Sequence, residues 1–176
     1  MSDVEIGRGK RGRITYAFDD VSLVPSRRTR EAELVSTSWK IDAFSFDHPV
    51  IAAPMDSVVS PRTAQTFSNA GGLAVLNLEG VWTRYEDPTK VLDEIAKLDA
   101  KAATARLQEI YAEPINSELI KQRIQDLRDI GITVAGSLSP QRTAQYAKTV
   151  VDAGVDIFVI RGTTVSAEHV SNGEEA

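Results

Sequence analysis

The sequence predicts an α/β fold with a parallel sheet, because a strand–helix–strand pattern occurs twice along the chain. Residues 60–76 read SPRTAQTFSNAGGLAVL, and residues 139–160 read SPQRTAQYAKTVVDAGVDIFVI. Both segments contain a Ser-Pro pair, a TAQ triplet and an Ala-Gly pair, and both end in an apolar run. Such runs are typical of strands that are covered on both faces, and right-handed crossovers join strands of this kind.

The boundaries of the two helices follow from their terminal residues. Ser60 and Ser139 suit the N-cap, where a hydroxyl accepts a hydrogen bond from an unpaired backbone N–H. The proline after each serine suits the first helical position, where no N–H is needed. Gly71 and Gly154 suit the left-handed conformation that ends many helices. These signals predict one helix between Ser60 and Gly71 and another between Ser139 and Gly154.

Apolar runs on either side of these helices predict four strands, and the polar stretch between the two units predicts three more helices. The last of these helices has an apolar face that we expect to pack on the sheet. The predicted strands are Val50–Pro54, Leu73–Leu76, Ile132–Leu138 and Val155–Ile160. The predicted helices are Pro88–Leu98, Lys101–Glu113 and Ser117–Ile130.

The first 48 residues are less regular than the rest. Ile14–Val24 mixes apolar and acidic residues, and Val35–Phe46 alternates loosely, so we expect short strands or a hairpin there. No linker-like tract of Gly and Ser interrupts the chain. We therefore predict a single domain over residues 1–176, with N-terminal strands and loops at 1–48 and βα units at 49–176.

Composition excludes several classes of protein. The chain has 176 residues, of which 42% are hydrophobic and 26% charged, and it contains no cysteine. These values exclude a disordered chain, a collagen and a disulfide scaffold. No apolar run approaches the roughly 20 residues that span a bilayer, and the N-terminus has no apolar region of a signal peptide. We expect a soluble cytoplasmic protein with no membrane partner, in which no thiolate serves as nucleophile or metal ligand.

Positive charge is concentrated near the N-terminus. One cluster spans residues 8–13 and a second spans residues 27–30, although the whole chain has a formal net charge of -5. A phosphate or nucleic-acid surface is one interpretation, and a solvated tail and loop is the other. The clusters contain no interleaved aromatic residues, which favours the second interpretation. We expect no nucleic-acid partner.

Ligand chemistry is expected at the carboxyl ends of the strands, where ligands bind in parallel α/β sheets. Small and hydroxyl residues there allow a ligand to approach the backbone closely. Arg161 at one such end can pair with a phosphate or a carboxylate, whereas Ser139 by itself is better explained as a helix cap. The predicted ends are Ala52–Ser57, Leu76–Asn77, Gly136–Ser139 and Ile160–Thr164.

Other groups of chemically reactive residues give weaker evidence for a functional site. Asp19 and Asp20 form a carboxylate pair, for which a turn or a structural role is the better interpretation than acid–base catalysis. The two histidines, His48 and His169, are far apart in the sequence, and His48 is expected in a loop. We therefore predict no metal site.

Four motifs, FDDVSLVP, PVIAAPMDS, AGGLAVL and AGVDIFV, together resemble the family of inosine monophosphate (IMP) dehydrogenases and guanosine monophosphate (GMP) reductases. FDDVSLVP at Phe18–Pro25 is similar to the opening DDVLLVP of that family, and PVIAAPMDS at Pro49–Ser57 is similar to its P-x-x-x-A-x-M-D-[ST] strand end. Ala70–Leu76 and Ala153–Val159 resemble two further strand motifs, in the same order. Longer segments such as VPSRRTR and LNLEGVWTRYEDP resemble a bacterial, IMP-dehydrogenase-related branch that lacks CBS domains.

The resemblance implies a (β/α)8 TIM barrel, of which this chain would hold roughly the first four strands. Such a barrel binds a purine mononucleotide (IMP or GMP) at the strand ends, with NAD or NADP beside it. In the dehydrogenase a cysteine attacks C2 of IMP, hydride passes to NAD, and water releases xanthosine monophosphate. In the reductase a similar cysteine handles GMP, ammonia leaves, and NADPH delivers hydride. The family also implies a homotetramer.

The resemblance assigns roles to residues by motif. Residues implied to contact the purine nucleotide are Ala53, Met55, Asn77, Gly162 and Thr163. Residues implied to contact the dinucleotide are Ser137, Ser139, Gln141, Arg161 and Thr164. No catalytic residue and no metal ligand is expected among the 176 residues. The cysteine, and the monovalent-cation site of the full-length family, would lie beyond them, so the chain alone is expected to be inactive.

Two departures from the family pattern leave alternatives open. Leu78–Gly131 is predicted to form helices, whereas the standard dehydrogenase inserts paired regulatory CBS modules at this place. No CBS domain is therefore expected. Arg161 stands where the family has an aspartate, and the reversed charge should change how nicotinamide or ribose is held. An IMP-dehydrogenase-related oxidoreductase is favoured over a GMP reductase. A non-catalytic nucleotide-binding or scaffolding protein remains the alternative from another class.

Overall fold

The computed structural model describes residues 3–25, 27–28 and 30–162. It divides the chain into two compact units, Met1–Ser36 and Thr37–Ala176. The single domain predicted for residues 1–176 stays a prediction. Within the described residues, no helix combines the length and the apolar character that crossing a membrane requires.

The first unit begins with a hairpin that the sequence analysis did not predict. Strands β1 (Asp3–Gly7) and β2 (Lys10–Arg13) pair antiparallel around a turn in which Gly9 has a φ of +69°. The register places Asp3 opposite Arg13 and Glu5 opposite Arg11. Opposite charges that face each other stabilise a strand pair. The first basic cluster therefore lies in a hairpin and not in an irregular tail, and its basic residues are exposed to solvent, as that interpretation expected.

The rest of the first unit consists of short turns. The strand expected within Ile14–Val24 is absent, and the 3-10 helix η1 (Phe18–Asp20) occupies its centre. The backbone N–H of Ala17 donates to Asp20 at 2.9 Å, so this aspartate closes a turn, as one of the two interpretations of the acidic pair predicted. A second 3-10 helix, η2, covers Ala32–Leu34. None of the described residues of this unit is buried.

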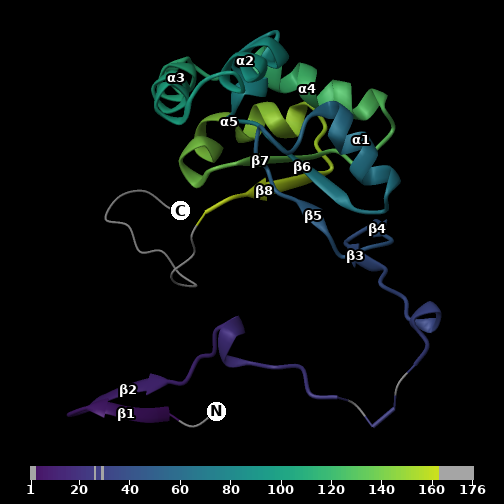
Figure 1. Cartoon of the computed structure of the whole chain (residues 1–176), viewed down its shortest axis with the longest axis vertical. Coiled ribbons are helices and arrows are strands. Elements are labelled where there is room, and N and C mark those ends of the chain that lie inside the picture. Colours follow the sequence, from purple (N-terminus) through teal and green to yellow (C-terminus); the bar gives the residue numbers. More distant parts are fainter. Residues whose placement is uncertain (1–2, 26, 29, 163–176) are drawn as a thin grey trace. The chain divides into compact units, whose positions relative to one another are not determined.

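The second unit is built on a four-stranded parallel sheet with the order β5-β6-β7-β8, so each strand lies beside the next one in the sequence (Figure 1). This winding is that of a (β/α)8 barrel and not that of a doubly wound sheet, which reverses its strand order. Each predicted strand is confirmed; three are shorter than predicted, and the one predicted at Leu73–Leu76 extends one residue further, to Asn77. The strands are β5 (Ile51–Ala52), β6 (Leu73–Asn77), β7 (Ala135–Leu138) and β8 (Ile157–Ile160).

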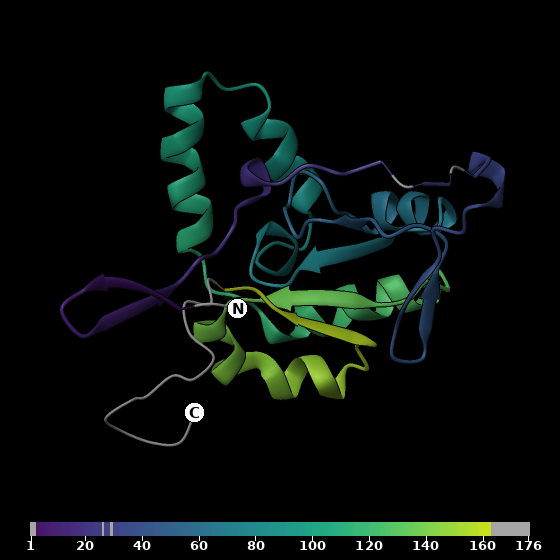
Figure 2. The same ribbon diagram turned by 90° about the horizontal axis from the view of Figure 1, so that it is seen from below.

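Two helices, Pro88–Ile95 and Ala100–Ala112, pack together with the segment after β6 in a small separate core. The other helices cover one face of this sheet, as Figures 1 and 2 show. Their apolar residues and those of the strands form the larger core, with Leu76, Ile120, Ile124 and Leu138 fully buried. The 3-10 helix η3 (Val81–Thr83) follows β6. The helices are α1 (Pro61–Asn69), α2 (Pro88–Ile95), α3 (Ala100–Ala112), α4 (Ser117–Asp129) and α5 (Pro140–Asp152).

A hairpin packs against the other face of the sheet. Strands β3 (Trp39–Ile41) and β4 (Phe44–Phe46) pair antiparallel, which confirms the hairpin expected within Val35–Phe46. The ring centroids of Trp39 and Phe46 lie 5.1 Å apart. Together with residues of β6, β7 and β8 this hairpin forms a second core, which fills the inner face of the sheet.

The predicted helix boundaries are confirmed where the signal is local. Ser60 accepts a hydrogen bond from the backbone N–H of Thr63 at 3.1 Å, and Gly71 and Gly154 have φ values of +83° and +84°. Ser139 is an exception. It occupies the N-cap position of α5 but makes no cap hydrogen bond with its side chain.

We expect the 176-residue chain, expressed alone, to self-associate, because among the described residues β5 and β8 each pair with one strand only, and exposed edges pair with other strands. Ile160 on β8 is 58% exposed. Size-exclusion chromatography with light scattering measures this. Ile160→Lys should reduce association, whereas Val151→Lys, an equally exposed position on α5, should not. A single 19.2 kDa species for the unaltered chain would contradict the expectation.

Candidate functional site

Polar side chains gather where the strands of the sheet end. Asn77 and Ser137 are register partners at the ends of β6 and β7, and both are buried. They share the inner face of the sheet, since side chains alternate along a strand. The backbone N–H of Arg161 donates to the carbonyl of Leu138 at 2.8 Å, so the pairing of β7 with β8 extends to this arginine. The strand ends therefore bring together residues far apart in sequence.

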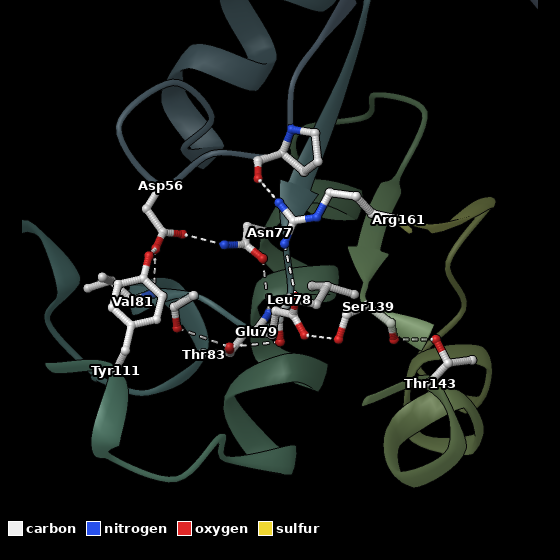
Figure 3. A network of polar contacts seen from close by, with 12 residues as sticks. Asp56, Asn77, Leu78, Glu79, Val81, Thr83, Tyr111, Ser139, Thr143 and Arg161 are labelled. Atoms are coloured by element: carbon white, nitrogen blue, oxygen red, sulfur yellow. Dashed lines mark hydrogen bonds and ion pairs between the residues drawn. The ribbon is translucent and has the colours of Figure 1, made fainter. Parts of the chain in front are cut away.

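Asp56 connects several of these elements (Figure 3). It lies in the loop after β5, and its carboxylate accepts hydrogen bonds from Asn77 Nδ2 at 3.2 Å and from the backbone N–H of Val81 at 2.8 Å. The hydroxyl of Tyr111 donates to the same carboxylate. Three donors from β6, η3 and α3 thus converge on one side chain. The arrangement fixes the loop after β5 against the elements that follow β6.

The Glu79 carboxylate forms a second connection, between β6 and the last two strands. Arg161 donates to Glu79 Oε1 at 2.9 Å, and the hydroxyl of Ser139 donates to Glu79 Oε2 at 2.8 Å. Arg161 also donates to the carbonyl of Pro54, after β5, at 2.9 Å. The bond from Ser139 to Glu79 explains why α5 has no side-chain cap. The Ser139 hydroxyl donates to a charged carboxylate and accepts no hydrogen bond from a backbone N–H of the helix. Hydrogen bonds to ionised groups are the stronger ones.

These two networks border one cleft of about 500 Å³. Its volume lies within the range of small-molecule sites. The walls combine carboxylates, guanidinium groups and apolar side chains, which suits a ligand with both polar groups and a flat apolar surface. Residues that line it include Met55, Asn77, Glu79, Arg84, Tyr111 and Arg161.

Met55, Asn77 and Arg161, three of the ten residues singled out from the sequence, line this cleft. Ala53 is exposed in the same loop as Met55, and Gly162 packs beside Pro140.

The residues expected at the dinucleotide are more dispersed. Ser139 reaches the network through Glu79. Ser137 is fully buried, and its hydroxyl has no hydrogen-bond partner among the described residues. Gln141 is exposed in the first turn of α5 and does not line the cleft. Thr163 and Thr164 lie outside the described residues.

Several residues of the site were missed by sequence reasoning. Asp56 stood within the predicted strand end but received no role, and Glu79 follows β6 by two residues. Both could have been found from their place after a strand. Tyr111 and Arg84 carry no such signal, because the fold alone brings them to the strand ends.

The other sequence candidates do not belong to this site. His48 lies in a loop, as expected, with its Nδ1 3.0 Å from the hydroxyl oxygen of Thr37. His169 is outside the described residues. Across the part of the chain that the structure describes, no group of three or more histidine, aspartate or glutamate side chains could hold a metal ion.

The Tyr111 phenol has a raised pKa, first because it is partly buried and second because it donates to the Asp56 carboxylate. Its contribution to stability is therefore present below the ordinary tyrosine pKa of about 10 and is lost as the pH rises through the higher folded-state value. Alkaline titration of tyrosinate absorbance tests this. The wild-type and Tyr111→Phe curves should differ only above about pH 10, and a difference centred below it would contradict the assignment.

Residues 15–173 match the model of a family described as the IMP dehydrogenase / GMP reductase domain. The chain belongs to this family. The match covers most of the sequence and all of the strand-end cleft, so the family membership expected from the four motifs is confirmed. The (β/α)8 type of fold is confirmed with it, because the parallel sheet has the strand order of a partial barrel.

Relatives in this family are similar along nearly the whole chain. An uncharacterised oxidoreductase of Mycolicibacterium smegmatis is 42% identical, with 98% of this chain and 47% of that protein covered. One from Mycobacterium tuberculosis is 44% identical with the same coverage. The crystal structure of an IMP dehydrogenase/GMP reductase-like protein from Corynebacterium glutamicum has a TM-score of 0.82 and 44% identity, and covers 96% of this chain and 46% of that one. The chain therefore spans about half the length of these relatives, which belong to an oxidoreductase family.

Proposed function

We propose that the complete protein transfers hydride between a nicotinamide dinucleotide and a purine mononucleotide, and that the strand-end cleft is part of its site. The observation that carries this proposal is the cleft itself, because Met55, Asn77 and Arg161 line it from three strand ends. Met55 and Asn77 stand at motif positions of the IMP dehydrogenase/GMP reductase family, and Arg161 stands where that family has an aspartate. Met55 offers a thioether surface for a purine ring, and Asn77 offers an amide, although the Asp56 carboxylate already engages one of its donors.

The side chains at the ends of β6, β7 and β8 fit a nicotinamide dinucleotide. The Arg161 side chain is 43% exposed, and its guanidinium is suited to bind a phosphate or carboxamide oxygen. Glu79 is the kind of acceptor that holds ribose hydroxyls, and its carboxylate is held by Arg161 and Ser139. The Ser137 hydroxyl, fully buried beneath the strand ends, has no partner among the described residues. We expect Ser139 and Gln141 to contribute at the rim. When bound, the dinucleotide supplies the ring that accepts or donates hydride.

The nucleophile is the part of the reaction that these 176 residues do not supply, because they contain no cysteine. In the proposal a cysteine elsewhere in the complete protein attacks the purine. The chain's own residues bind and orient the nucleotide, and the Glu79 carboxylate holds the Arg161 guanidinium in place at the strand ends. We expect no turnover from the 176 residues alone. A non-catalytic nucleotide-binding role is the alternative for them.

An assay of the protein expressed from its complete reading frame tests the proposal. NAD reduction with IMP is the expected result, and it assigns an IMP-dehydrogenase-related activity in guanine nucleotide synthesis. NADPH oxidation with GMP assigns the reductase instead. If the protein binds IMP or GMP in calorimetry but gives neither of these two signals, the non-catalytic binding role is favoured. We further propose a cytoplasmic homotetramer, in keeping with the family.

A further inference from the structure

Helix α3 contributes one side chain to the strand-end cleft, the ring of Tyr111. The helix belongs to the segment between β6 and β7, and its one buried residue is Ile110. Leu107 and the polar residues of α3 face solvent. Tyr111 differs from them, because its hydroxyl binds Asp56, as Figure 3 shows, and its ring lines the cleft.

Two contacts hold the Tyr111 ring in place. Its hydroxyl donates to Asp56, whose carboxylate is fixed in turn by the Asn77 amide and a backbone N–H. The guanidinium carbon of Arg84 lies 5.5 Å from the ring centroid, within the range of a cation–π contact. The ring is thus oriented before a ligand arrives. A ligand that packs on it costs little additional side-chain freedom.

The exposed part of this ring belongs to a cleft that can seat a flat group. Tyr111 is 42% exposed, and Met55 and Leu92 add apolar surface in the same cleft. We propose that Tyr111 is a specificity-determining residue, against which a planar heteroaromatic ring of the nucleotide ligand packs. The inference rests on the proposed function and deepens it, since it adds a ligand contact from a helix outside the barrel strands.

Two rings have this chemistry, the purine of IMP or GMP and the nicotinamide of the dinucleotide. Binding to the complete protein distinguishes them, with IMP, nicotinamide mononucleotide and ribose 5-phosphate as separate probes. Trp82 is a suitable reporter, because its indole N–H donates to the backbone carbonyl of Asp56 at 3.4 Å. The variants are Tyr111→Leu, Tyr111→Phe, and Leu107→Ala as a control on the same helix but outside the cleft.

Tyr111→Leu should raise the Kd of the ligand whose ring packs on it about tenfold, the effect of losing one aromatic stacking contact. Tyr111→Phe should bind nearly as well as the wild type, because it keeps the ring. Leu107→Ala should change nothing. Ribose 5-phosphate has the sugar and phosphate but no ring, so its Kd should be the same for every variant. A rise confined to IMP assigns the purine, and one confined to nicotinamide mononucleotide assigns the nicotinamide.

Equal Kd values of Tyr111→Leu and wild type for both ring-bearing probes would overturn the inference and leave the proposed function intact. An equal loss of affinity for ribose 5-phosphate would also overturn it, since the residue would then act on the fold of the cleft as a whole. If the wild type binds none of the probes, the proposed function fails first, and the inference fails with it. If Tyr111→Leu does not fold, Tyr111→Phe still tests the inference, because a marked rise of its Kd for both ring-bearing probes would contradict a role of the ring alone.

Discussion

Replacing Gly80 with alanine is expected to lower the free energy of unfolding of the complete protein by about 2–3 kcal/mol and to weaken nucleotide binding. A Cβ on Gly80 would lie 2.0 Å from Asp56 Oδ1 and 2.5 Å from Asn77 Nδ2. Neither atom can move freely, because the two side chains hydrogen-bond each other. The carboxylate and the amide must therefore shift together, and the cleft changes shape.

Urea unfolding and a binding titration with IMP measure the two effects of Gly80→Ala. Gly131→Ala is the matched control, because Gly131 has a φ of +79° and no atom within 4 Å of an added Cβ. The control should lose about 1–2 kcal/mol from backbone strain alone and should leave IMP binding unchanged. Unaltered stability and binding in Gly80→Ala would show that the loop after β6 is not constrained by Asp56.

Removal of the Asp56 carboxylate should have the second large effect. Asp56→Ala leaves three donors without their acceptor, on Asn77, Val81 and Tyr111. Each unpaired buried donor costs about 1–3 kcal/mol. Asp56 is only partly buried, so water can replace some of the lost bonds. We expect the free energy of unfolding to fall by about 2–4 kcal/mol.

Asp56→Asn is the informative companion variant. The amide keeps one acceptor oxygen but presents an N–H₂ group to one of the three donors, so we expect a smaller loss than in Asp56→Ala. Combining Asp56→Ala with Tyr111→Phe should give a loss smaller than the sum of the two, because both changes remove the same hydrogen bond. Strict additivity in urea unfolding would show that this bond contributes nothing measurable.

Local patterns in the sequence predicted the helices well. The Ser60 cap and the left-handed Gly71 depend only on residues within the same turn, so the type of residue is enough to identify them. The same reasoning failed at Ser139, which has the same local sequence. A carboxylate 60 residues earlier competes for its hydroxyl, and the distance along the chain hides that competitor.

The N-terminal hairpin shows the same limitation in a different form. Polar and apolar residues alternate in β1, DVEIG, but β2, KRGR, has three charged residues and no apolar side chain, so the pair lacks the pattern of two half-buried strands. The hairpin depends on which residues face each other, and Glu5 opposite Arg11 is a consequence of register. Register is set by the turn at Gly9 together with the paired strands, and a pattern of single residues does not contain it.

The sequence by itself determined the family, the order of the strands and the strand-end positions of Met55, Asn77 and Arg161. Only the tertiary structure decided which side chains meet there. Asp56 and Tyr111 are 55 residues apart, Glu79 and Arg161 are 82 apart, and Pro54 and Arg161 are 107 apart. Local helix signals such as the Ser60 cap depend on neighbours along the chain, whereas these contacts depend on how parallel strands align and where the intervening helices return.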